Sequence, residues 1–395
     1  MPTDADDAQR TALRHALIEG LQRQGTITDA RIAEAFATVP RHLFLPQIAP
    51  EQVYSNQAII TKTAGGVNIS SSSQPAMMAI MLGQLLVEQR QRILEIGAGT
   101  GYNAALLRFL VGPSGRVTTI DVDDDIVETA RAQIAAAGYY DVRVILGDGG
   151  YGHAADAPYD RIILTVGASD LLPAWHEQLR PDGLLVLPLS LGPGMYSLAL
   201  RKLSNGTLIS ESLSPCGFIR LRGVFASIER AVAFGEWQVA CEPGPRLDPA
   251  RLPELLAQPP TMITLPAETA EVQFFLAFTG EPLARLLRRN AEEQPDLYSE
   301  QHALLDTVAL SGCTIPGWQD PTITQFGEPF AYERLRAKLA QWAALGKPRL
   351  NDLRVLVLPR GGGIAPPPDA LTIERPHATF VLTRRDGRPL SAQQG

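Results

Sequence analysis

RILEIGAGTGYN, residues 92–103, is the stretch that decides the expected fold. Ile93, Leu94 and Ile96 predict a short buried strand, and the alternate glycines after them predict a tight turn that opens a helix. Such a turn exposes backbone N–H groups and lets a ligand approach the main chain closely. Glu95 lies within the strand, where a carboxylate is costly unless it is paired. We therefore expect Glu95 to face a ligand crevice.

The glycine pattern separates two classes of cofactor. Dinucleotide folds prefer G-x-G-x-x-G, whereas Gly97, Gly99 and Gly101 form G-x-G-x-G. A pyrophosphate would also meet the negative charge of Glu95. The sulfonium and amino groups of S-adenosylmethionine (SAM) suit an acidic, glycine-lined crevice better, so we predict SAM as the cofactor. The alternative is a tight turn in an unrelated α/β protein.

Strands and helices continue to alternate after this turn. The sequence predicts strands at residues 117–120, 142–146, 161–166 and 184–189, and helices at 103–110, 125–137 and 171–179. This order predicts an α/β fold with a doubly wound, Rossmann-like parallel sheet that is covered by helices on both faces. Ligands of such sheets bind at the carboxyl ends of the strands.

Two aspartates follow strands at that edge of the predicted sheet. Asp121 ends the second strand, where a carboxylate can accept hydrogen bonds from ribose hydroxyls. Asp148, beside Gly149, follows the third strand and can accept from the amino group of adenine. For Asp121 the alternative is a solvated acidic loop, because residues 123–125 are also aspartates.

A run of four serines, from Ser70 to Ser73, precedes Gln74 and Pro75. Methionines at helical spacing follow and predict a helix with a buried face. Serine before proline in a first turn is typical of a helix N-cap. Helix N-termini also bind anions, so these serines either cap the helix or help to receive a carboxylate substrate.

The composition indicates a globular chain of about two domains. It has 395 residues, a net charge of -7 and three widely spaced cysteines that match neither a zinc nor a disulfide pattern. The acidic balance does not indicate a nucleic-acid surface, and no apolar run reaches the length of a membrane span. The polar, acidic N-terminus does not resemble a signal peptide. We therefore expect a cytoplasmic protein with no nucleic-acid, membrane or metal partner.

The histidines give a weaker signal. The six histidines are scattered and favour structural roles, although His42 and His153 lie nearest the crevice in the sequence.

The second half of the sequence predicts strands at 272–278, 353–358 and 378–383 and a helix around 332–342, which together suggest a smaller α/β or α+β domain. Five arginines there offer either a grip on an acidic peptide or a solvated helix face, namely Arg285, Arg288, Arg289, Arg334 and Arg336.

Several motifs together resemble the protein-L-isoaspartate O-methyltransferases. They are VPRHLFLP (39–46), SQP (73–75), LEIGAGTGYNAALL (94–107), IDVD (120–123), GDG (147–149) and APYDRIILTVGA (157–168), and the similarity covers roughly residues 10–225. The resemblance implies a SAM-dependent enzyme that methylates an isoaspartyl carboxylate in a peptide. We accordingly expect a catalytic domain over residues 1–230 and a C-terminal extension over 231–395, which such repair enzymes lack.

The resemblance also implies roles for individual residues. The serine of the SQP triplet is the family's active-site serine, which indicates Ser73, and the four-serine run leaves Ser70, Ser71 and Ser72 as alternatives in register. The positions that match the SAM site are Gly97, Gly99, Gly101, Asp121, Val122, Asp148 and Gly149, and we add Glu95 from its place in the strand.

The four serines, CGFIRLRG (216–223) and the long extension resemble a subgroup associated with ribosomally made modified peptides, such as lanthipeptides, lasso peptides and graspetides. That similarity implies an aspartyl methyl ester that closes to a succinimide (aspartimide), on a precursor peptide bound with help from the extension. Repair of isoaspartyl residues in damaged proteins is the alternative function. An inactive SAM-binding scaffold or sensor is the alternative of another class, and an oligomerisation module is the alternative role for the extension.

Overall fold

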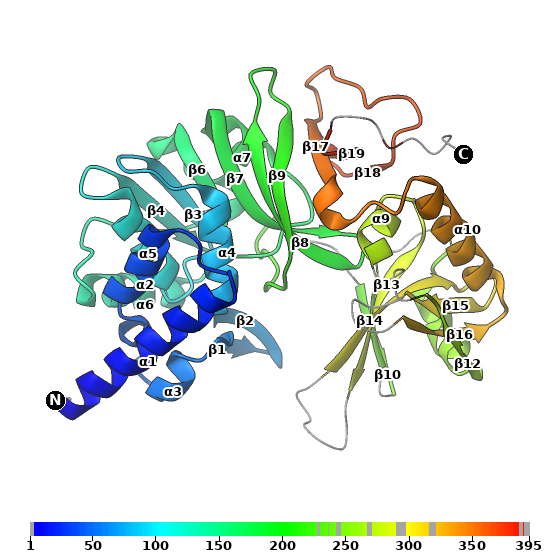
Figure 1. The fold of residues 1–395 in the computed structure, drawn as a ribbon, viewed down its shortest axis with the longest axis horizontal. Helices are drawn as coiled ribbons and strands as arrows, with labels where there is room; N and C mark the ends of the chain where they lie inside the picture. The colour runs from blue at the N-terminus through cyan, green and yellow to red at the C-terminus, as the bar shows by residue number, and fades with distance from the viewer. Residues whose placement is uncertain are drawn as a thin grey trace. The chain divides into compact units, whose positions relative to one another are not determined.

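The computed structural model describes residues 4–226, 230–235, 237–241, 246–266, 271–289, 298–315, 321–386 and 390. The chain divides into two compact units (Figure 1). The first unit comprises Met1–Leu189 and Tyr196–Ala226, and the second comprises Ser190–Met195 and Ser227–Gly395. The expected functional division, with catalysis before residue 231 and peptide recognition after it, stays a prediction.

The first unit is built on a mixed sheet with strand order β9-β8-β7-β6-β3-β4-β5. Strands β6, β3, β4 and β5 pair in parallel with their neighbours, as does β7 with β6, whereas β8 and β9 are antiparallel. Their bounds are β3 Arg92–Ile96, β4 Arg116–Asp121, β5 Arg143–Leu146, β6 Tyr159–Leu164, β7 Leu179–Leu191, β8 Gly194–Lys202 and β9 Leu208–Pro215. The predicted α/β fold is therefore confirmed, and β8 and β9 are additions that the sequence did not predict.

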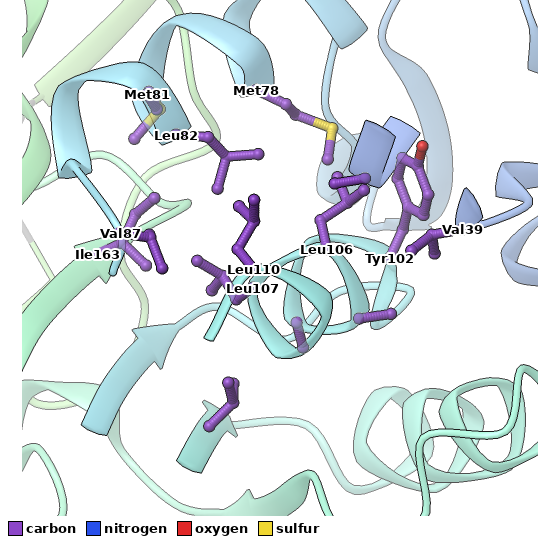
Figure 2. Packing of buried hydrophobic residues seen from close by; sticks show 14 of the residues in the cluster. Val39, Met78, Met81, Leu82, Val87, Tyr102, Leu106, Leu107, Leu110 and Ile163 are labelled. Atoms are coloured by element: carbon purple, nitrogen blue, oxygen red, sulfur yellow. The ribbon is translucent and has the colours of Figure 1, made fainter. Parts of the chain in front are cut away.

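Helices cover this sheet and bury one large apolar cluster. They are α1 Asp4–Arg23, α2 Ala30–Thr38, α3 Pro50–Val53, α4 Pro75–Leu85, α5 Tyr102–Val111, α6 Asp124–Ala136 and α7 Pro173–Gln178. Figure 2 shows Met78, Met81 and Leu82 of α4 near Leu107 and Leu110 of α5. Burying each such side chain stabilises the fold by roughly 1.5–3 kcal/mol. The methionine face is thus core, as its helical spacing predicted.

Of the two roles left open for the serine run, capping of α4 is not the one that the structure shows. The N-cap of α4 is Gln74, which makes no side-chain capping bond, and Pro75 occupies the first turn. Ser70 to Ser72 instead end strand β2, Val67–Ser72, which pairs antiparallel with β1, Ile59–Ala64. The serine run forms a strand because β1 supplies a pairing partner that the sequence pattern did not reveal. Ser73 is left between the strand and the helix.

The second unit holds an antiparallel sheet of seven strands in the order β10-β11-β13-β14-β15-β16-β12. Their bounds are β10 Arg230–Phe234, β11 Trp237–Cys241, β12 Pro260–Thr264, β13 Leu283–Arg289, β14 Tyr298–Asp306, β15 Ser311–Thr314 and β16 Thr322–Gly327. Three further strands also pair antiparallel, namely β17 Leu353–Pro359, β18 Thr372–Glu374 and β19 Ala378–Arg384. The helices are α8 Leu252–Leu256, α9 Gln273–Ala277 and α10 Phe330–Ala344.

Parts of this second unit differ from expectation. The strands expected at 353–358 and 378–383 are present, but residues 272–278 contain helix α9 rather than a strand. A short apolar run such as FFLAF has no period that separates strand from helix, which explains the error. Arg334 is paired with Glu281 and Asp306, so it does not form a free cationic face. The side chains of Arg288 and Arg289 lie outside the described residues.

Candidate active site

One cavity in the first unit, partly open to solvent, collects most of the predicted site residues. Its walls come from the serine run, the glycine turn after β3, the residues that follow β4 and β5, and the segment from Ile219 to Arg222. The predicted residues on its wall are Ser70, Ser71, Ser72, Ser73, Gly97, Gly99, Asp121, Val122 and Gly149. Glu95, Gly101 and Asp148 are not among the lining residues.

The glycine turn packs so closely against its neighbours that a side chain would not fit at Gly97 or Gly101. Gly97 has φ of +100°, and a Cβ built on it would lie 2.6 Å from the hydroxyl oxygen of Thr165. Gly101 has φ of +83°, and its Cβ would lie 2.7 Å from Cγ1 of Ile134 in α6. Gly97 thus lets the turn approach Thr165 closely, and Gly101 permits close packing of α5 against α6.

Asp121 is joined to the glycine turn through its carboxylate. Its Oδ2 accepts a hydrogen bond from the backbone N–H of Gly99 at 3.1 Å, and its Oδ1 accepts from Val122 N–H at 2.9 Å. Burial raises the pKa of Asp121 above its usual range, and these backbone donors oppose that rise. The acid after β4 therefore sits on the cavity wall with its position fixed by main-chain donors.

Glu95 differs from the expectation that it faces the crevice. Its carboxylate is fully buried and accepts hydrogen bonds from Asn103 Nδ2 at 2.7 Å and Thr119 Oγ1 at 2.6 Å. Burial raises the pKa of Glu95 to about 7. The chain itself supplies the partners that a buried carboxylate requires, so Glu95 connects β3 to α5 and β4 instead of lining the cavity.

Asp148 does not line the cavity either, because its carboxylate is hydrogen-bonded to nearby main-chain N–H groups. Its Oδ1 accepts from Gly150 N–H at 2.8 Å, and its Oδ2 accepts from Val224 N–H at 2.7 Å. These bonds connect the turn after β5 to the end of the segment that carries Arg222. Of Asp148 and Gly149, the second residue alone lines the cavity.

The serine run is contacted by a buried arginine that sequence reasoning did not single out. Arg41 Nη2 donates to the carbonyl of Ser73 at 3.0 Å and to Oγ of Ser72 at 3.2 Å. The hydroxyl of Ser70 accepts from Thr61 Oγ1 at 3.0 Å across the β1–β2 hairpin. The only available signal for Arg41 was its place in the VPR motif, since nothing in the local pattern indicates a contact with the serines.

Ion pairs join three parts of the cavity's surroundings. Arg222 donates to both carboxylate oxygens of Asp123, at 3.0 and 2.8 Å, and Lys62 of β1 donates to Asp123 at 3.2 Å and to Asp125 at 2.6 Å. The hydrogen bond from Arg222 lowers the pKa of Asp123. The acidic loop after Asp121 is therefore an ion-pair network rather than only a solvated loop.

The histidines with weak sequence support lie away from the cavity wall. His42 Nδ1 is 2.8 Å from the hydroxyl oxygen of Tyr54, and the backbone N–H of His153 donates to Gln178. Within the described ranges, no three His, Cys, Asp or Glu side chains are placed to hold a metal ion. Nor does that part of the chain contain a helix long and apolar enough to cross a bilayer.

Comparisons with known sequences find similarity in the first unit. The family model described as Protein-L-isoaspartate(D-aspartate) O-methyltransferase (PCMT) matches residues 12–224. The protein-L-isoaspartate O-methyltransferase of Methanopyrus kandleri is 35% identical over 219 residues, which are 55% of this chain and 95% of that protein. The enzyme of the same name from Ignicoccus hospitalis is 35% identical over 209 residues, which are 53% of this chain and 96% of that protein.

A solved structure named protein-L-isoaspartate O-methyltransferase shares the fold over a longer stretch. It has a TM-score of 0.52 and 23% identity, and the match covers 87% of this chain and 96% of that chain. A match of that length must include part of the second unit. The likeness in fold therefore extends beyond the first unit, whereas the sequence relatives above cover little more than half of the chain.

Proposed function

Because the chain belongs to the protein-L-isoaspartate(D-aspartate) O-methyltransferase family, we propose that it methylates an aspartyl or isoaspartyl side-chain or main-chain carboxylate within a peptide. It is a SAM-dependent carboxyl O-methyltransferase of this type. The observation that carries the proposal is the meeting of the serine run, the glycine turn and Asp121 on one cavity.

The residues on the cavity wall fit SAM. When bound, SAM supplies an electrophilic methyl group on its sulfonium. Gly97 and Gly99 line the cavity with main chain alone, and Asp121 is a fixed acceptor for ribose hydroxyls beside Val122. Asp148 and Gly149 form the turn after β5, beside which we expect the adenine to bind. Glu95 and Gly101 do not line the cavity. Glu95 is hydrogen-bonded to Asn103 at the start of α5, and Gly101 lets the turn pack against α6.

The acceptor requires placement rather than activation. A carboxylate is already ionised and nucleophilic at neutral pH, so no general base is needed. The chain must instead hold one carboxylate oxygen in line with the methyl group and exclude water. We assign this role to the hydroxyl of Ser73, with Ser72 and Ser70 as the alternatives in register, because all three lie on the cavity wall.

The methyl ester is the activated product. Attack on the ester carbonyl by the backbone nitrogen of the following residue forms a C–N bond, expels methanol and closes a five-membered succinimide. The narrower proposal is that this ring formation matures a ribosomally made peptide, which the serine run and the CGFIRLRG segment support by their resemblance to that subgroup. Hydrolysis of the same ring would instead repair an isoaspartyl residue.

Mass spectrometry of peptides incubated with the protein and SAM tests the proposal. A short isoaspartyl peptide and its aspartyl twin are compared, and a gain of one methyl group followed by loss of methanol is expected for an acceptor. Methylation of the isoaspartyl peptide alone would favour repair. Methylation confined to a precursor peptide would favour maturation, and no transfer to any carboxylate despite SAM binding would contradict the proposal.

For the second unit we propose a role in holding the substrate peptide. It carries a groove along α10 whose two charged lining residues, Arg336 and Lys347, are both cations. Tyr332 and Leu339 supply apolar surface beside them. Such a lining suits an acidic segment that also bears apolar side chains.

A further inference from the structure

Arg41 is a buried cation for which the described part of the chain provides no carboxylate. Its exposed fraction is 1%, and it opens the short 3-10 helix η1, Arg41–Phe44. Its Nη2 bonds to Ser72 and Ser73, but its Nη1 and Nε find no acceptor among the described residues. Its other neighbours are aromatic: the ring centroid of Tyr102 lies 5.8 Å from Cζ, and Tyr54 also interacts electrostatically with the guanidinium.

An unneutralised guanidinium in the interior is unfavourable unless a counter-charge is supplied. Arg161 in the same unit shows how the fold uses a buried arginine purely for structure, because it donates to the carbonyls of Leu85 and Leu86. Arg41 differs because its hydrogen-bonding partners, Ser72 and Ser73, line the cavity. The missing negative charge can therefore be one that enters the cavity.

The contacts of Arg41 prepare the serine run to receive an anion. Since Oγ of Ser72 accepts from Arg41, the hydroxyl proton of Ser72 is left to donate elsewhere. The carbonyl of Ser73 belongs to the same peptide unit as the N–H of Gln74, the N-cap of α4. A guanidinium on that carbonyl polarises the peptide unit and strengthens its N–H as a donor.

Resting on the carboxyl methylation proposed above, we propose that Arg41 is a positioning residue that supplies the positive charge for the acceptor carboxylate of the peptide. It acts through the Ser72 hydroxyl and the Ser73 peptide group that it holds. Because it acts through these groups rather than by direct contact, the carboxylate gains orientation and charge compensation without losing its nucleophilicity to a tight ion pair. The arrangement selects a carboxylate over a carboxamide, which has nearly the same shape but no charge.

The test is a comparison of two peptides that differ only in this charge. Binding of a short isoaspartyl peptide and of its carboxamide twin is measured by calorimetry, with S-adenosylhomocysteine present so that no transfer occurs. Wild-type protein should prefer the carboxylate by about tenfold or more. Arg41→Gln should lose most of this preference while keeping its affinity for S-adenosylhomocysteine, and Arg41→Lys should keep part of it.

Arg161→Gln is the matched control, because it removes a second buried guanidinium that bonds to main-chain carbonyls away from the cavity. It should lower stability and leave the preference unchanged. If Arg41→Gln does not fold, Arg41→Lys and Ser72→Ala carry the test, and both should reduce the preference. Added guanidinium at millimolar concentration should restore the preference in Arg41→Ala.

Equal loss of affinity for both peptides in Arg41→Gln would indicate a merely structural role and overturn the inference, as would a wild-type protein that does not distinguish the twins. Failure of the proposed function is a separate result. In that case methyl transfer to peptides is absent, whereas the charge preference in binding can still be measured.

Discussion

Asp121 and Gly99 are joined by a hydrogen bond of 3.1 Å from the glycine N–H to the carboxylate, although 22 residues separate them. The acid after β4 and the turn after β3 therefore form one wall of the cavity. Any ligand that lies against the turn also meets a carboxylate whose position is fixed. The hydrogen bond therefore fixes the negative charge of Asp121 beside the glycine turn.

Asp121→Ala should weaken binding of SAM by roughly 10- to 100-fold, because it removes an anionic acceptor for ribose hydroxyls. Calorimetry with S-adenosylhomocysteine measures this effect. Asp124→Ala, in the exposed first turn of α6, removes the same charge and should change the affinity less than about twofold. Similar losses in the two variants would reject a specific role for Asp121.

Ser73→Ala should slow methyl transfer by roughly 10- to 100-fold with little change in SAM affinity, because the hydroxyl orients the acceptor and not the cofactor. Single-turnover rates for alanine variants of all four serines decide the register. A larger loss in Ser72→Ala or Ser70→Ala than in Ser73→Ala would move the assignment to that residue.

Glu95 should make the stability of the protein depend on pH. Its folded pKa of about 7 lies above its ordinary value of 4.5, so its contribution to stability is full below pH 4.5 and falls as pH rises through 7. The loss amounts to roughly 3 kcal/mol. Glu95→Gln cannot titrate, so its free energy of unfolding relative to wild type should increase between pH 5 and pH 8, by most of this amount.

Urea unfolding of both proteins across this pH range measures the difference. Wild-type carboxylates with lowered pKa, such as Asp123 and Asp141, are common to both proteins and cancel in the comparison. A difference that does not change with pH would mean that Glu95 is already ionised at low pH or that it is equally stable in both forms.

Lys62→Met should raise the KM for the acceptor peptide severalfold, because it releases the β1–β2 hairpin, which carries the serines, from Asp123 and Asp125. The melting temperature should change little, since Lys62 is partly exposed to solvent and its pairs are screened by salt. Arg31→Met, which breaks another exposed ion pair with Asp29, is the control and should leave KM unchanged. An unchanged KM in Lys62→Met would show that the hairpin does not depend on this pair.

Arg336→Glu should weaken binding of an acidic precursor peptide without affecting SAM, because it reverses one of the two cations in the groove along α10. Arg349→Glu reverses a charge of the same unit that does not line the groove. Equal effects of both substitutions would point to overall charge rather than to the groove.

The fold of the first unit was predictable where apolar strands end in glycine or aspartate, as at Ile96 and Asp121. The β1–β2 hairpin was not, because its pairing of Ile59 with Ser72 depends on contact rather than on a local pattern. The strand predicted at residues 272–278 was wrong, because an apolar run this short fits both a strand and a helix.

The site was predictable to the same extent. Gly97, Gly99 and Asp121 follow strands whose carboxyl ends meet, so their convergence could be deduced from topology. Arg41 and Arg222 could not be deduced in that way, because their partners lie 31 and 99 residues away in the sequence. Glu95 was predicted to face the crevice, because the sequence did not reveal that Asn103 and Thr119 would donate hydrogen bonds to its buried carboxylate.

Asp123 is shared by Lys62 of the serine-bearing hairpin and by Arg222 of the segment after β9. One carboxylate thus joins the part of the chain assigned to the acceptor and the part that borders Asp121. Heterotropic linkage follows from such sharing: if SAM tightens this junction and increases peptide affinity by some factor, the peptide must increase SAM affinity by the same factor. The order in which the two substrates bind would then be a matter of kinetics, while their mutual effect is fixed by a thermodynamic cycle.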